Sequence, residues 1–70
     1  MIPYGIPEWS HVTLRVFDIL GRTVATLVDG PQEAGNHYVV FSGRELASGM
    51  YLYRLQAGNF SMTKKMLVIR

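Results

Sequence analysis

The chain has 70 residues, a formal net charge of +2, 49% hydrophobic and 17% charged residues, and no cysteine. A chain of this length holds one domain, residues 1–70, and its lack of cysteine excludes disulfides, thiolate metal sites and a cysteine nucleophile. The hydrophobic content excludes a disordered tail, and no apolar run approaches the ~20 residues that cross a bilayer.

Turn-forming residues recur about every 8–12 positions, which predicts a small antiparallel β-sandwich. Residues 2–7 alternate apolar residues with proline and glycine. Because proline cannot donate to a ladder, this segment is at best an edge strand, and without basic residues it is unlike a signal peptide. Residues 11–17 place Val12, Leu14 and Val16 on one face at a period of two, and they predict the clearest strand.

A tight turn is predicted after this strand. The Asp18 carboxylate can accept hydrogen bonds from the backbone ahead of it, and Gly21 can adopt the left-handed conformation that closes a hairpin. Residues 23–28 are β-branched at four of six positions and predict the returning strand. The polar residues 29–36, rich in turn formers, predict a loop.

The second half of the chain continues the pattern of strands and turns. Residues 43–49 predict a connection in which Leu46 is the apolar anchor. Gly58 and Asn59 predict a two-residue hairpin turn of the primed type. The remaining strands are expected at residues 37–42, 50–56 and 60–70.

A more specific signal lies where the connection ends. Gly49-x-Tyr51 opens the penultimate strand. In immunoglobulin-like (Ig-like) sandwiches, a tyrosine near the start of the strand called F bonds back to the preceding backbone, forming a tyrosine corner. Tyr51 is either that residue or a plain core tyrosine with its hydroxyl at the rim.

The chain shows no pattern of catalytic or metal-binding residues. His11 and His37 lie near no carboxylate at a metal-ligand spacing, and we interpret them as surface histidines. No pair of carboxylates is arranged for acid–base hydrolysis, and no phosphate-binding loop occurs. We therefore expect no enzyme activity, no cofactor, no metal and no nucleic-acid partner.

Three aromatic residues were considered as a flat platform for sugar rings: Trp9, Phe17 and Tyr53. Tyr53 shares its strand face with Tyr51 and Leu55, which places it in the core. Trp9 is then left as a single exposed candidate for carbohydrate binding.

The last segment breaks the alternation expected of a half-buried strand. Lys64 and Lys65 fall on opposite faces, and residues 66–69 put apolar groups on both. Such a strand is either covered on both sides, or one apolar side is open to a partner that pairs with the sheet edge. The four basic residues from Arg54 to Arg70, with no acidic one, suit an anionic partner or a charge-protected edge.

Taken together, these motifs resemble a known family. Residues 12–28 are similar to the V-x-L-x-V-Y-D-x-x-G-R-x-V-x-x-L core of the type IX secretion C-terminal sorting domains of Bacteroidetes-like bacteria. The resemblance continues through Gly35, the Leu-Ala-Ser-Gly-x-Tyr box within residues 46–55 and the basic, hydrophobic end at 64–70. The Ig-like domain of flagellar hook-capping proteins shares this overall pattern.

The resemblance implies an Ig-like sandwich of about six to seven strands with a Greek-key-type arrangement. It implies a non-catalytic module that directs a secreted hydrolase or adhesin, in the same chain, through the periplasm and the outer membrane to the cell surface or the medium. The implied partners are the outer-membrane secretion and attachment machinery. By position, partner recognition falls to Gly49, Tyr51, Lys64, Lys65, Met66, Val68 and Arg70, while Asp18 and Gly21 form the structural turn.

The chain also departs from the family pattern. Family members usually have an Asn-Pro-rich lead and a fuller first strand, which this chain lacks. An incomplete sheet edge can pair with a second copy, so a homodimer is a possible assembly. Two other functions remain as alternatives: a passive Ig-like structural or assembly module, and a carbohydrate-binding module that uses Trp9.

Overall fold

The structure is a computed structural model that describes residues 2–41 and 46–69. These residues form six strands and no helix, which confirms the all-β prediction at the lower of the two expected strand counts. Within this part of the chain no helix is long and apolar enough to cross a membrane. The strands are β1 (Ile2–Ile6), β2 (Ser10–Asp18), β3 (Thr23–Gln32), β4 (Gly35–Val39), β5 (Gly49–Ala57) and β6 (Phe60–Val68).

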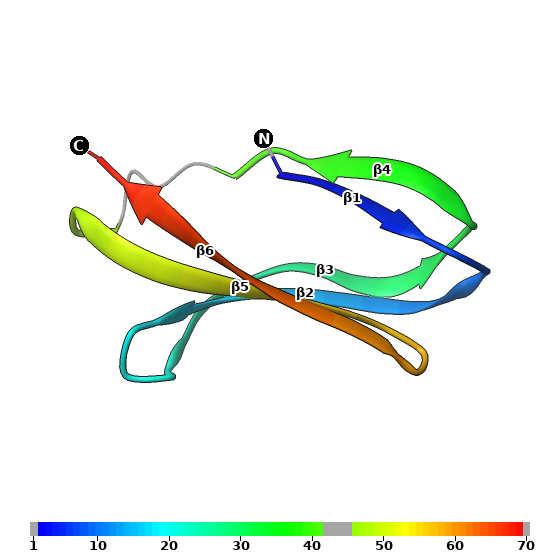
Figure 1. Cartoon of the computed structure of the whole chain (residues 1–70), viewed down its shortest axis with the longest axis horizontal. Helices are drawn as coiled ribbons and strands as arrows, with labels where there is room; N and C mark the ends of the chain where they lie inside the picture. The colour runs from blue at the N-terminus through cyan, green and yellow to red at the C-terminus, as the bar shows by residue number, and fades with distance from the viewer. Residues whose placement is uncertain (1, 42–45, 70) are drawn as a thin grey trace.

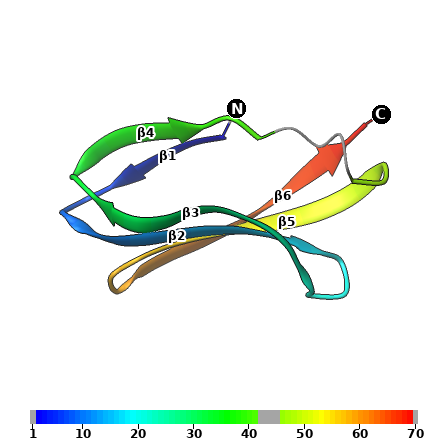
Figure 2. The same cartoon turned by 180° about the vertical axis from the view of Figure 1, so that it is seen from behind.

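The strands form two antiparallel sheets that lie over one another as a sandwich (Figure 1, Figure 2). The smaller sheet has the order β1-β4, and the larger has the order β3-β2-β5-β6. The chain leaves the larger sheet after β3, forms β4 in the smaller one and returns as β5 beside β2. This topology is that of an Ig-like sandwich. The sheet β1-β4 corresponds to strands B and E, and the sheet β3-β2-β5-β6 corresponds to strands C′, C, F and G, so that β5 is strand F.

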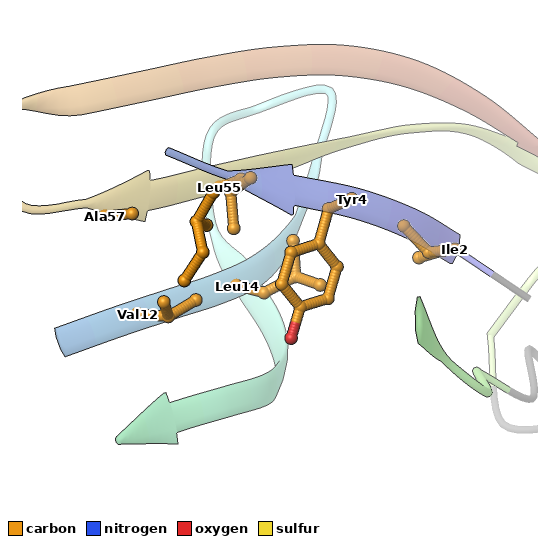
Figure 3. Packing of buried hydrophobic residues seen from close by; sticks show 7 residues of the cluster. Ile2, Tyr4, Val12, Leu14, Leu55 and Ala57 are labelled. Atoms are coloured by element: carbon orange, nitrogen blue, oxygen red, sulfur yellow. The ribbon is translucent and has the colours of Figure 1, made fainter. Parts of the chain in front are cut away.

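The core lies between the two sheets. Val12 and Leu14 of β2 and Leu55 of β5 are at most 1% exposed, which confirms the predicted buried face of β2. They pack in one cluster with the buried residues of β1, including Tyr4. Figure 3 shows the Tyr4 ring reaching from β1 toward the layer that contains Leu14 and Val12. The smaller sheet therefore acts as a lid that removes the apolar face of β2 and β5 from water.

Tyr4 and His37 of the smaller sheet make contacts with each other, with the end of β3 and with the turn that follows it. The Tyr4 hydroxyl of β1 donates a hydrogen bond to the side-chain oxygen of Gln32, the last residue of β3. The Tyr4 ring stacks on His37 of β4 with 5.4 Å between ring centroids. His37 donates from Nε2 to the Glu33 carbonyl at 2.6 Å, within the turn that joins β3 and β4. Of the two histidines predicted to lie on the surface, His11 is exposed, while His37 is half-buried and makes these structural contacts.

The predicted polar loop at residues 29–36 is wrong in extent, because β3 runs on through Gln32 and β4 begins at Gly35. Glycine and proline at positions 30 and 31 were interpreted as turn formers. β3 is an edge strand with no described strand on its far side, and an edge tolerates a residue that lacks a backbone N–H, such as Pro31. The fourth strand consequently begins two residues before its predicted range of 37–42 and ends at Val39.

The other boundaries lie close to the predicted ones. Gly58 has a φ of 59° while Asn59 has a negative φ, which is the pattern of a type II′ turn and confirms the primed hairpin. β6 ends at Val68, and Arg70 lies outside the described residues. Leu46 is half-buried, whereas residues 42–45 lie outside the described part of the connection.

Shortening Leu14 to alanine is expected to lower the free energy of unfolding by about 2–5 kcal/mol, because the cavity forms where neighbours are held by both sheets. That loss is comparable to the whole stability of a domain of this size. Urea unfolding followed by circular dichroism measures it. The exposed turn residue Leu20 provides the control, and Leu20→Ala should change the value by less than about 0.5 kcal/mol. Equal effects of the two substitutions would show that the core is placed wrongly.

Candidate functional site

β6 is an edge strand. It pairs with β5 along one side, and no described strand pairs with its other side. An edge strand of this kind presents a row of unpaired backbone N–H and C=O groups. Near its end, Leu67 is 65% exposed and Ile69 80% exposed. Of the two explanations for the irregular apolar pattern, the structure therefore has the open strand and not the strand covered on both faces.

The two lysines of β6 lie on opposite faces, as predicted. Lys64 is opposite Tyr53 in the register and shares the inner face with Met62 and Met66, which pack on the core. Lys65 is on the outer face, opposite Leu52 of β5. Both lysines are exposed. An inward-pointing lysine on an edge strand discourages indiscriminate pairing with other sheet edges, so β6 is open yet protected by charge.

Tyr51 forms the tyrosine corner that the sequence left as one of two alternatives. It is buried, and its hydroxyl donates a hydrogen bond of 2.8 Å to the backbone carbonyl of Ala47. Gly49, between these two residues, has a φ of 154°, a backbone conformation that L side chains rarely adopt. The corner fixes where the connection ends and where β5 begins.

Register brings several predicted recognition residues together. Gly49 is opposite Val68, and Tyr51 is opposite Met66, so the start of β5 lies against the end of β6. Lys64 and Lys65 precede this region on β6. We refer to the paired ends, residues 49–51 and 64–68, as the terminal hairpin site. Arg70, predicted to belong to it, lies outside the described residues.

Asp18 and Gly21 form the predicted turn between β2 and β3. The Asp18 Oδ1 atom accepts hydrogen bonds of 2.9 Å from the backbone N–H groups of Leu20 and Arg22, and Oδ2 accepts one of 2.8 Å from the Arg22 side chain. Gly21 has a φ of 87°, the left-handed conformation that closes the turn. The Arg22 backbone hydrogen bond, followed by the Arg22 side chain and the Leu20 N–H, lowers the pKa of Asp18. Asp18 is opposite Tyr51, so the turn adjoins the tyrosine corner.

The outer face of the larger sheet, which points away from β1 and β4, carries two shallow hollows that the sequence analysis missed. They share Phe17 of β2 and Arg54 of β5, one extending toward Leu52 and Thr63 and the other toward Arg15. Period-two alternation does assign these side chains to the face opposite the core. However, it does not show that β2 and β5 are neighbours, which is what creates the hollows.

The three aromatic residues considered as a sugar platform do not come together. Trp9 is exposed before the start of β2, and Phe17 lies near the end of that strand, on the order of 20 Å away. Tyr53 is packed against the core on the inner face, as predicted. Among the described residues there is also no group of three or more His, Cys, Asp and Glu side chains arranged to hold a metal ion.

Comparison with known proteins gives one family match. Residues 2–69 match the model of a family described as the secretion system C-terminal sorting domain. No curated protein and no solved structure gives a match. The family match spans the whole described structure, including both sheets and the terminal hairpin site.

Replacing Tyr51 with phenylalanine removes the hydroxyl that donates to the Ala47 carbonyl and leaves the rest of the buried ring in place. We expect the free energy of unfolding to fall by about 0.5–1.5 kcal/mol. Tyr53→Phe is the matched control on the same strand face, and it should change the value by less than about 0.5 kcal/mol. Urea titration of both variants measures the difference, and an equal response would argue against the corner as a stabilising bond.

The Asp18 turn predicts a dependence of stability on pH. Because the pKa of Asp18 is lower in the folded than in the unfolded chain, its contribution is fully present above about pH 4 and is lost as the pH falls further. Asp18→Asn should therefore be less stable than the wild type at pH 7, and the difference should shrink between about pH 4 and pH 2. Urea midpoints across this range measure it. A difference that stays constant with pH would show that the carboxylate charge plays no part.

Proposed function

Because the chain belongs to the family of secretion system C-terminal sorting domains, we propose that its terminal hairpin site is the surface by which the type IX secretion machinery recognises it. A domain of this family is a C-terminal sorting signal, and it implies a secreted cargo protein in the same chain that passes the outer membrane. The chain then acts as a non-catalytic targeting module. The chemistry of the whole protein resides in its cargo.

The observation that carries the proposal is the unpaired edge of β6. Its free N–H and C=O groups can pair with an extended segment of the machinery, which would add a strand to the larger sheet. In this kind of pairing the affinity comes from main-chain hydrogen bonds between the machinery and the sorting domain. The same pairing can therefore serve sorting domains that are attached to different cargo proteins. The flanking side chains, Lys64 and Lys65 with the exposed Leu67, then provide selectivity on the two faces of the strand.

Gly49 and Tyr51 position this edge rather than contact the partner. Tyr51 is buried and bonded to Ala47, and it is held opposite Met66, while Gly49 is held opposite Val68. In this proposal, the corner sets the end of β6 in a fixed place relative to the core. Recognition residues proposed from the family pattern are Lys64, Lys65, Met66, Val68 and Arg70, with Gly49 and Tyr51 as their support.

Three finer points belong to the proposal. Transit passes through the periplasm, and attachment to the cell surface follows export. The domain has no enzyme activity, which agrees with the family's role as a sorting signal. A homodimer through the free edge of β1 stays a prediction, since no contact among the described residues bears on it.

An export assay tests the proposed site. Residues 1–70 are fused to the C-terminus of a periplasm-directed reporter in a bacterium that has a type IX system, and the reporter is measured in the medium, on the cell surface and in the periplasm. The intact fusion should leave the cell. Removal of residues 66–70 should keep most of the reporter in the periplasm, because the end of the edge strand is lost. Ser61→Ala, an exposed change at the other end of β6, is the control and should export normally.

The same assay separates the sorting signal from a passive structural module. A spacer predicts equal localisation of the intact and shortened fusions. Circular dichroism of the purified 65-residue domain determines whether the shortened chain is folded, and charge reversal at Lys65 offers a variant that leaves the strand complete. Export of Lys65→Glu and of the shortened fusion at wild-type levels would contradict recognition at β6.

A further inference from the structure

The outer face of the larger sheet carries an ordered pattern of side chains. Strand register places Arg15 of β2 directly opposite Arg54 of β5. Their partners on the flanking strands are Thr26 of β3 and Thr63 of β6, so a single row crosses the sheet with a threonine at each end. All four side chains are exposed. This row contains hydrogen-bond donors and two positive charges, and it contains no carboxylate.

The two arginines form a like-charge pair without a compensating acid. Like charges directly opposite one another on adjacent antiparallel strands destabilise a sheet. The ion pairs within the described residues are His11 with Asp29 and Arg22 with Asp18, and neither includes Arg15 or Arg54. Guanidinium groups are planar and bind carboxylates through two parallel hydrogen bonds, so a pair of neighbouring arginines suits a carboxylate ligand. The outer face therefore carries two guanidinium groups that form no ion pair with a carboxylate of the described residues.

An apolar pair lies next to the arginine row, between Thr23 of β3 and Lys65 of β6. Phe17 of β2 is opposite Leu52 of β5, and both line the hollow that also includes Arg54 and Thr63. One row further along, Met50 is opposite the exposed Leu67. Successive rows on one face are two residues apart, which is about 6.8 Å along an antiparallel strand. Alternate side chains of an extended peptide have the same spacing.

We propose that this outer face binds an extended segment of a protein partner in which an acidic residue is followed, two and four positions later, by apolar residues. The carboxylate contacts Arg15 and Arg54, and the first apolar side chain fills the hollow between Phe17 and Leu52. A phosphate or another small anion would use the arginines alone and leave the apolar hollow empty, so the combined surface favours a peptide. The surface shares Met50 and Leu67 with the terminal hairpin site, but it uses side chains on the outer face and not the backbone edge of β6.

This inference adds a class of partner to the proposed function and does not depend on it. Peptide binding is measured with the purified 70-residue chain, without secretion. Export that depends on residues 66–70 while the peptide fails to bind would remove only the outer-face inference. Peptide binding without export would remove only the proposed function.

Fluorescence anisotropy with a labelled synthetic peptide tests the site. The peptide has glutamate, leucine and leucine at alternate positions with threonines between them, and the control peptide has lysine in place of glutamate. We expect saturable, salt-sensitive binding of the first peptide, weakened about fivefold by Arg54→Gln and about twentyfold when Arg15→Gln is added. Lys64→Gln removes the same charge from the inner face and should change the affinity less than about twofold. Equal affinities of all variants, or of both peptides, would overturn the proposal.

Two further measurements separate this role from a structural one and from membrane binding. Relief of the like-charge pair should raise the urea midpoint of Arg54→Gln above that of the wild type, and added salt should remove the gain. A lower midpoint would mean that the arginines stabilise the sheet, contrary to the proposal. Vesicles of phosphatidylglycerol are the second probe, and binding to them without binding to the acidic peptide would assign the face to a lipid surface instead.

Discussion

The antiparallel pairing of β2 with β5 is the interaction on which the rest of the domain depends. These two strands occupy the centre of the larger sheet. Each is the first strand of a hairpin, β2 with β3 and β5 with β6. Their inner sides supply Val12, Leu14, Val16 and Leu55, the four described side chains that are at most 1% exposed. Val12, Leu14 and Leu55 pack against the smaller sheet. Since a slip of one residue would move this whole set to the solvent face, burial holds the register firmly. The outer face inherits that register, including the juxtaposition of Arg15 with Arg54.

Local chemistry was enough to predict the hairpins but not the way they join. The alternation of β2, the Asp18 turn and the turn at Gly58 each follow from residues that are close in sequence. The tyrosine corner at Tyr51 was predicted as one alternative because the motif is local too. In contrast, the strand after the Asp18 turn was predicted to end at Val28, before Gly30 and Pro31, whereas β3 continues to Gln32. Whether those residues form a turn or an edge strand depends on what lies beside them, which only the assembled sheet determines.

The candidate sites show the same division. β6 was singled out from its irregular pattern, and its residues do lie together, since Gly49 meets Val68 and Tyr51 meets Met66. The outer-face row was missed because its two arginines belong to strands that are distant in sequence. Each arginine alone looks like an ordinary exposed residue. The outer-face row lies outside the core, so changes in it need not disturb the folding of the domain. The terminal hairpin site, in contrast, includes the buried Tyr51 and Met66, which packs on the core.

The proposed recognition at the terminal hairpin site has a consequence for the state of the cargo protein at export. A linear signal peptide can be recognised in an unfolded chain, whereas the opposed ends of β5 and β6 are brought together by strand pairing in the folded domain. A site that is made of residues from two paired strands is not present in either strand alone. Recognition at this site would therefore also test whether the sorting domain is folded. A cargo protein whose sorting domain is unfolded would carry the full sequence of the signal and would still not be exported.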